Sequence, residues 1–241
     1  MTRLRIPPTA IFGIIVLALF IGFALIGPWI VPYDPETTVG RTWSGPSAEF
    51  WLGTDNIGRD ILSRVISGAR TTIGLALVTT LLSFAIGVSL GIFAAVAGPR
   101  VDAFLSRVID MFLSVPVLIM ALIVLTALGS SIPTLILTIA LLDSTRVYLV
   151  ARAVAVDVAT RDFVDVARLR GESLPWIMAH EILPNALPPL ISEFGLRFCF
   201  NFLYVASLSF LGLGVQPPQA DWGGMVRENG QAITFGILAP I

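Results

Sequence analysis

Long stretches without a charged residue are the feature that most limits how this sequence can fold. Residues 6–33 and 71–99 contain no Asp, Glu, Lys or Arg. About 20 consecutive apolar residues are enough for a helix to cross a bilayer, so both stretches predict membrane spans. Of the 241 residues, 56% are hydrophobic and 13% are charged, roughly half the charged share of a soluble domain. We therefore predict an all-α integral membrane protein, built as a polytopic helical bundle.

Five spans are predicted, together with the beginning of a sixth. The apolar stretches are 10–31, 71–99, 103–128, 134–149 and 187–214. Residues 234–241 resemble the start of another apolar segment that is too short to cross a membrane, so we expect the sixth span to be truncated. A signal peptide is the alternative for the first stretch, but its apolar core would be about 7–15 residues. A retained span is therefore expected.

The loop after the first span divides the predicted chain. Residues 1–71 are expected to hold the first span and an extracytoplasmic loop, and 72–241 the transmembrane core. Within the loop, the spacing from Asp55 to Ser67 fits an amphipathic helix that leads into the second span. Asp55 or Asn56 is the expected cap of that helix.

The arginine distribution predicts the orientation, because cytoplasmic segments carry an excess of positive charge. Placing the N-terminus in the cytoplasm puts more arginines in inner than in outer segments. The inner ones are Arg3, Arg5, Arg100, Arg107, Arg146, Arg152, Arg161, Arg168 and Arg170, and the outer ones Arg41, Arg59, Arg64, Arg70 and Arg227. The polar stretch 161–188 then lies in the cytoplasm.

This polar stretch, residues 161–188, separates two apolar blocks and predicts two short helices joined by a turn. Asp162 can cap the first helix, and Val164, Ala167 and Leu169 give it a small apolar side. Gly171 follows it, as glycine commonly does just past a helix. The second is expected to start near Ser173 and end before Pro184. The stretch is a candidate docking element for a cytoplasmic motor, and an ordinary amphipathic loop is the alternative.

Several function classes lack their required residues. The chain contains no lysine, which a Walker A phosphate loop needs. The net charge of −1 gives no basic surface for nucleic acid. His180 is the single histidine and Cys199 the single cysteine, so neither a metal site nor a catalytic nucleophile–base pair is predicted. His180 is expected to make a helix-end hydrogen bond.

The polar stretch resembles the "EAA" loop of binding-protein-dependent ABC importer permeases. The family pattern is E-A-A-x-x-x-G, followed by I, H and L-P. Asp165 stands here for the Glu and Val166 for the first Ala, and both departures bear on partner choice. Ala167, Gly171, Ile177, His180, Leu183 and Pro184 match the pattern.

Four further segments resemble the C-type dipeptide, oligopeptide and nickel permeases. They are V-P-Y-D-P at 31–35, W-L-G-T-D-N-I-G-R-D-I-L-S-R at 51–64, S-F-L-G-L-G-V-Q-P-P at 209–218 and D-W-G-G-M at 221–225. The resemblance covers nearly the whole chain, in the order of the family.

The resemblance implies a permease that forms half of a translocation pathway in the bacterial inner membrane, surrounded by lipid. Its expected partners are a second homologous permease, two cytoplasmic ATPases that bind ATP and Mg, and an extracytoplasmic binding protein. No cofactor is expected on this chain. The implied ATPase-coupling residues are Val164, Asp165, Val166, Ala167, Arg168, Gly171, His180, Leu183 and Pro184. The implied outer-loop residues are Gly53, Thr54, Asp55, Gly58, Arg59, Asp60, Asp221 and Trp222; the last two could meet the binding protein or form a folded cap over the pore.

Ionisable residues inside the predicted spans leave two interpretations open. Glu193, Arg197 and Asn201 follow at i, i+4 and i+8, so they share one helical face, and Asp143 and Arg146 lie in another span. Such groups are costly in lipid and often functional, so they could line the pathway. They could equally form structural pairs between helices. An ion-coupled secondary carrier using Asp143, Glu193 and Arg197 is the alternative function, and a membrane-anchored enzyme is a third.

Overall fold

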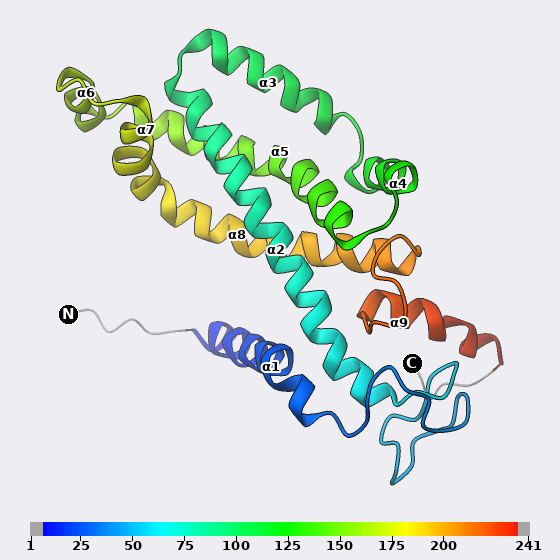
Figure 1. Ribbon diagram of the computed structural model, residues 1–241. Helices are drawn as coiled ribbons and strands as arrows, with labels where there is room; N and C mark the ends of the chain where they lie inside the picture. Colours follow the sequence, from blue (N-terminus) through cyan, green and yellow to red (C-terminus); the bar gives the residue numbers. More distant parts are fainter. Residues whose placement is uncertain (1–6, 236–241) are drawn as a thin grey trace. The chain divides into compact units, whose positions relative to one another are not determined.

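The computed structural model describes residues 7–235, which are helical without any β-strand in that range (Figure 1). This confirms the all-α prediction. The helices are α1 (Pro8–Ile30), α2 (Ile61–Val96), α3 (Pro99–Leu113), α4 (Val117–Leu128), α5 (Ile132–Ala159), α6 (Asp162–Leu169), α7 (Leu174–Ile177), the π turn η1 (Met178–Ile182), α8 (Leu183–Phe210), α9 (Trp222–Asn229) and the 3-10 helix η2 (Gly230–Phe235).

The chain forms two compact units. Unit 1 combines Met1–Gly74 with Ala206–Ile241, and unit 2 is Leu75–Val205. Helices α2 and α8 each begin in one unit and end in the other. The predicted division into segments 1–71 and 72–241 is a division along the sequence, and it stays a prediction.

Three helices of the described residues are long and apolar enough to cross a membrane: α1, α2 and α5. They confirm the first, second and fourth predicted spans. If the bent pair α3 and α4 together forms one membrane span, the number of spans is four. The predicted fifth span falls within α8, whose 28 residues include Glu193 and Arg197. The count of five is thus not confirmed, and the predicted sixth span falls largely on residues 236–241, outside the described range.

The predicted third span, 103–128, is not one straight helix. Helices α3 and α4 are separated by three residues and bend by 82° (Figure 1). Pro116 occupies the N-cap of α4 and has no backbone N–H to donate. A proline also moves the preceding residue out of the α region, which ends α3 before Val115. The pair is therefore a broken span or a re-entrant loop.

The start of α2 also differs from the prediction. The helix begins at Ile61, and residues 55–60 form a loop instead of its first turns. Asp60, rather than Asp55 or Asn56, is the cap, because its Oδ2 accepts hydrogen bonds from Ser63 N at 2.8 Å and Ser63 Oγ at 2.6 Å. From there α2 continues without a break for 36 residues.

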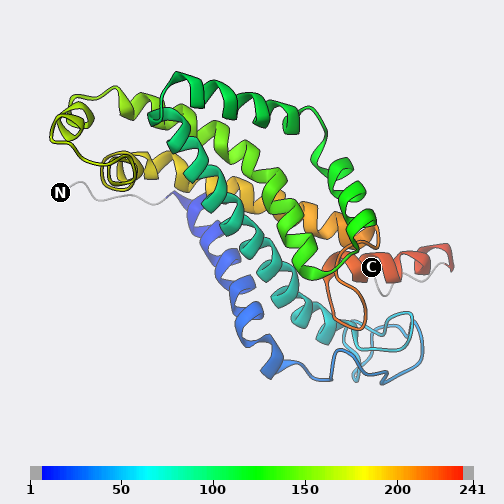
Figure 2. The same ribbon diagram turned by 45° about the horizontal axis from the view of Figure 1, so that its top comes forward.

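Unit 2 is built on α5. In the most apolar 18-residue stretch of α5, 61% is buried, whereas only 6% of the corresponding stretch of α1 is buried. Gly87 and Gly91 let α2 pass close to α5, since a Cβ on Gly91 would lie 2.8 Å from the carbonyl oxygen of Tyr148. Such small residues, four apart, are typical of close helix crossings in membranes. Helix α3 lies alongside α5 (Figure 2).

Unit 1 joins the two ends of the chain. Gly27 of α1 meets Ile66 of α2, where an added Cβ would lie 3.0 Å from the isoleucine side chain. Trp222 of α9 packs on Gly68 and makes an edge-on contact with Phe20, with ring centroids 5.7 Å apart. The C-terminal segment is therefore part of the same unit as α1 and the start of α2.

Candidate functional site

Helix α6 of the polar stretch is anchored by two apolar side chains. Val164 and Ala167 are fully buried in a cluster with residues of α2, α5, α7 and η1. Leu169 was predicted to share that side, but it is 88% exposed. The helical period explains the correction: Val164 and Ala167 are three residues apart and lie on one face, whereas Leu169 is about 140° away from Val164.

The outward face of α6 carries three apolar side chains that follow at i, i+3 and i+6. They are Phe163, Val166 and Leu169, of which only Val166 was named as a coupling residue from the sequence. Asp165 is exposed beside them and lies 3.4 Å from Arg168, oxygen to nitrogen. Apolar residues on a short exposed helix form a surface suited to a partner.

Gly171 reverses the chain after α6. Its φ is +81°, the N–H of Gly171 donates to Arg168 O at 2.9 Å, and the N–H of Glu172 donates to Ala167 O at 3.2 Å. This glycine-centred cap satisfies the last carbonyls of the helix. A Cβ added to Gly171 would meet nothing within 4 Å, so the glycine is needed for its backbone conformation rather than for space.

The second helix of the polar stretch does not end before Pro184 as predicted. Helix α7 continues through the π turn η1 into α8, and Leu183 and Pro184 lie in the first turn of α8 (Figure 2). Pro184 lies just after the π turn, which departs from the regular i to i−4 hydrogen-bond pattern that a proline would interrupt. The polar stretch 161–188 is therefore directly continuous with a long helix.

His180 and Arg170 hold the turn together. The His180 ring stacks on Trp176 with centroids 4.8 Å apart, and its Nδ1 lies 3.1 Å from Trp176 O. The Arg170 guanidinium lies 5.6 Å from the centroid of the same indole and 3.6 Å from Glu181. These contacts join the end of α6 to α7 and η1.

The intramembrane residues named from the sequence meet in unit 2. Asp143 of α5 is fully buried; its Oδ2 accepts from Ser83 Oγ of α2 at 3.0 Å and from Asn201 Nδ2 of α8 at 3.1 Å. Its Oδ1 lies 3.5 Å from Arg197 Nη1, and Arg197 Nε lies 2.7 Å from Glu193 Oε1. The cluster thus connects three helices.

Two neighbouring side chains complete the description of this intramembrane cluster. Thr80 of α2 accepts a hydrogen bond from Asn201 Nδ2 at 3.1 Å. Arg146 does not join the cluster and instead donates to Tyr204 Oη at 3.0 Å. Ser83 and Thr80 were not singled out from the sequence, because hydroxyl residues are common in apolar helices, where they also bond to the backbone.

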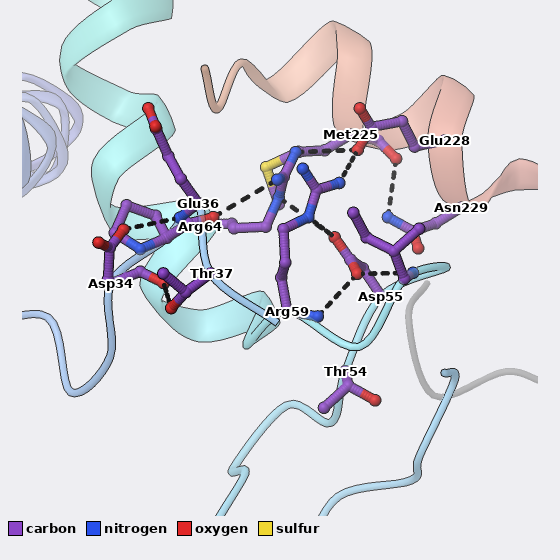
Figure 3. Close-up of polar contacts among 12 residues, drawn as sticks. Asp34, Glu36, Thr37, Thr54, Asp55, Arg59, Arg64, Met225, Glu228 and Asn229 are labelled. Atoms are coloured by element: carbon purple, nitrogen blue, oxygen red, sulfur yellow. Dashed lines mark hydrogen bonds and ion pairs between the residues drawn. The ribbon is translucent and has the colours of Figure 1, made fainter. Parts of the chain in front are cut away.

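A second charged cluster shapes the loop before α2 in unit 1 (Figure 3). Asp55 Oδ1 accepts from the backbone N–H groups of Ile57 and Arg59, and its Oδ2 lies 2.6 Å from Arg59 Nε. Glu228 Oε2 accepts from Arg59 Nη2 at 2.7 Å and from Arg64 Nη2 at 2.9 Å. The cluster therefore binds the loop to α9. The pairing with Glu228 was missed, as no local pattern links residues so distant in sequence.

The remaining named residues of this loop also face inward. Gly53 and Gly58 have φ values of +78° and +85°, and an added Cβ would lie 2.3 Å from Ser44 O and 2.2 Å from Gly40 O respectively. Thr54 is fully buried, accepts from Ser44 N at 2.9 Å and donates to Arg41 O. These residues of the motif at 51–64 therefore determine the conformation of the loop.

Asp221 and Trp222 are folded into unit 1. Asp221 is buried and caps α9, accepting from Gly224 N at 2.9 Å and from Thr72 Oγ1 at 2.9 Å. Trp222 Nε1 donates to Val65 O at 2.8 Å. Of the two alternatives left open by the sequence, a folded segment fits these contacts better than a free docking surface.

Within residues 7–235, no group of three or more His, Cys, Asp or Glu side chains could hold a metal ion. The described clusters offer anchoring, docking and helix-to-helix contact.

Comparisons with known proteins agree with this description. The family model "Binding-protein-dependent transport system inner membrane component" matches residues 87–241, and "N-terminal TM domain of oligopeptide transport permease C" matches residues 1–44. A solved structure described as an amino acid ABC transporter with histidines shares the fold, with a TM-score of 0.52, 19% identity, and coverage of 74% of this chain and 83% of that one.

Curated relatives share the sequence over most of their length. The di/tripeptide transport system permease protein of Pseudomonas aeruginosa (strain UCBPP-PA14) is 35% identical over 226 residues, which are 91% of this chain and 75% of the relative. The nickel transport system permease protein of Escherichia coli (strain K12) is 34% identical over 222 residues, 92% and 80% of the two chains. The chain therefore belongs to the family of inner-membrane components of binding-protein-dependent transport systems, a family of transport permeases and not of catalytic enzymes.

Proposed function

We propose that this chain is a transmembrane permease subunit of an ATP-driven importer, and that it forms half of the pathway for peptides, similar small solutes or nickel. The names of the relatives support these substrate classes, since they include di/tripeptide, D,D-dipeptide and nickel transport systems. Selection among the substrates is expected to reside largely in a separate binding protein.

The proposed assembly has five other components. They are a second homologous permease, two cytoplasmic ATPases that bind and hydrolyse ATP with Mg, an extracytoplasmic binding protein and the surrounding lipid of the bacterial inner membrane. The N-terminus is placed in the cytoplasm, so the loop before α2 faces outward and α6 faces the ATPases. The arginine distribution supports this orientation.

The anchoring of α6 is the observation that carries the proposal. Val164 and Ala167 fix α6 in the same apolar cluster as Ile92 and Val96 of α2 and Ala155 of α5. Packed interiors transmit displacement because they compress little. A movement of the ATPase against the exposed face of α6 is therefore passed to the two spanning helices α2 and α5 as a rigid-body motion.

In this proposal, the intramembrane cluster in unit 2 keeps α2, α5 and α8 together while they move. Asp143 and Asn201 are fully buried, which supports a role in holding α2, α5 and α8 together. Glu193 is the more accessible carboxylate of the group, with 15% of its side chain exposed. We assign the substrate contact of this cluster to Glu193.

The test uses the positive φ of Gly171. Gly171→Val should lower ATP-dependent uptake by roughly tenfold, because a left-handed backbone costs a non-glycine residue about 1–2 kcal/mol, and about 1.4 kcal/mol is a factor of ten. Asparagine tolerates this conformation, so Gly171→Asn is the matched control and should retain most of the uptake. Uptake of a radiolabelled dipeptide or of nickel into proteoliposomes containing the whole transporter is the measurement.

Co-purification of the ATPases supplies the second measurement. The valine variant should reach the membrane in normal amounts but retain less ATPase. Normal uptake and normal co-purification for Gly171→Val would contradict the coupling role of α6.

A further inference from the structure

The outer loop presents two large apolar side chains at the tip of a turn. Trp51 is 72% exposed and Leu52 is 41% exposed. They are the central residues of a turn closed by the hydrogen bond from Gly53 N to Phe50 O, at 3.0 Å. A tryptophan exposed to this degree next to a leucine is costly in water, which suggests a surface that a partner covers.

The turn that carries them is held in place on both sides. Phe50 is buried against Tyr33 with ring centroids 5.4 Å apart, and its backbone accepts from Ser47 N at 2.8 Å. Gly53, on the other side, is fixed by its positive φ and its contact with Ser44. A preorganised apolar tip loses little conformational entropy on binding, which favours tight association.

The exposed charged residues in the segment 32–52 that carries the tip are mostly acidic. Asp34, Glu36 and Glu49 are exposed in this loop, and Arg41 is the exposed cation of the same segment. The two acidic stretches are joined, because the Tyr33 ring contacts the Phe50 ring at a tilt of 43° and the Tyr33 hydroxyl donates to Glu49 O at 3.4 Å. An acidic rim repels anionic lipid headgroups, so it argues against insertion of the tip into the membrane.

We propose that Trp51 and Leu52 form the docking tip for the extracytoplasmic binding protein, which would receive Trp51 in an apolar pocket bordered by basic side chains. Tryptophan is over-represented among the residues that dominate binding energy at protein interfaces. The complementary charges would speed the encounter and set its orientation. This inference rests on the proposed function, because it requires that the loop before α2 faces outward and that a binding protein delivers the substrate.

The experiment measures the affinity of the binding protein for the whole transporter in lipid nanodiscs. The probe is the purified, substrate-loaded binding protein of the same transport system. Trp51→Ala should weaken its binding by at least about tenfold, as expected for a central interface aromatic. Phe12→Ala is the matched control, since Phe12 in α1 is 70% exposed but lies within the apolar span Pro8–Gly27; the affinity of this variant should stay within about twofold of that of the unaltered protein.

A charge variant tests the rim separately. Glu49→Lys should slow association, and the effect should shrink as salt is raised, because rim charges act mainly through long-range attraction. Basal ATP hydrolysis should stay unchanged in all three variants, which shows that the transporter is folded.

Two results would overturn the inference while leaving the proposed function intact. One is binding within about twofold for Trp51→Ala in a transporter that takes up substrate normally. The other is quenching of Trp51 fluorescence by brominated phosphatidylglycerol, measured as the difference between the unaltered protein and Trp51→Phe, which would place the tip in the membrane. If the unaltered transporter shows no binding-protein-dependent uptake, the proposed function itself fails, and the inference with it.

Discussion

Asp143 illustrates how single buried charges are accommodated in this chain. Its carboxylate receives one contact each from Ser83 of α2 and from Asn201 and Arg197 of α8. The orientation of the Asn201 amide follows from its partners, since Nδ2 must donate to both Asp143 and Thr80. A buried charge with several partners is tolerable, but removing one partner leaves an uncompensated charge.

Arg197→Met is therefore expected to destabilise the protein by about 3 kcal/mol, the lower end for a broken buried ion pair, because Ser83 and Asn201 still donate to Asp143. The measurement is the free energy of unfolding in nanodiscs, from denaturant titration. The double variant Asp143→Asn with Arg197→Met removes both charges and should recover at least half of the loss. Equal stability of the single and double variants would show that the two charges do not interact.

Single residues also show what the sequence could reveal about the site. The shared face of Glu193, Arg197 and Asn201 was predictable from their spacing of four, and so was the turn at Gly171. Their meeting with Asp143, more than 50 positions earlier, was not, because spacing describes neighbours on one helix only. Phe163 and Leu169 were missed for a different reason: the apolar side of α6 was assigned without following its helical period.

At the scale of elements, the ends of helices were harder to predict than their existence. Pro116 within an apolar run was a signal for the bend between α3 and α4, since a residue before proline disfavours the α conformation. Hydropathy alone does not reveal this bend, because apolar residues occur on both sides of the break. The start of α2 likewise depended on choosing among Asp55, Asn56 and Asp60, all good caps, and tertiary contacts of Asp55 decided the choice.

The crossing of α2 and α5 gives a prediction at the same scale. Gly91→Ala should lower the free energy of unfolding by about 1–3 kcal/mol, because its Cβ would lie 2.8 Å from the backbone of both Tyr148 and Arg152. Gly74→Ala is a control in the same helix, where a Cβ meets nothing within 4 Å; it should be neutral or gain up to about 1 kcal/mol of helix propensity. Thermal unfolding in nanodiscs distinguishes the two. A neutral Gly91→Ala would mean that the helices separate easily here.

For the whole molecule, composition was enough to predict the membrane class and the helical fold, and the relatives confirm the family. Composition could not predict the number of spans, because α8 contains charged residues that form ion pairs inside unit 2. Hydropathy counts such residues as if they faced lipid. The sequence also could not predict that the C-terminal segment joins the N-terminal segment in one unit. This arrangement depends on contacts between distant residues, such as the hydrogen bond from Thr72 to Asp221.

The proposed orientation predicts which side of the membrane each polar segment occupies. In a Cys199→Ser background, which has no other cysteine, Glu49→Cys should react with a membrane-impermeant maleimide added to spheroplasts. Leu169→Cys, at a position of α6 that is 88% exposed, should react only after permeabilisation. Cells without the ATPase subunits should be used, so that a bound partner does not shield residue 169. The reverse pattern of labelling would invert the proposed topology.

The inward-facing motif of the outer loop has a consequence for how such transporters can diversify. Gly53, Asp55 and Arg59 fix the loop from within, whereas Trp51 and Leu52 occupy its tip and are 72% and 41% exposed. Under the proposed docking role, recognition and folding are thus encoded at different positions of one short segment. A duplicated copy of this gene can therefore acquire a new delivery partner by replacing two side chains, without first having to evolve a new loop.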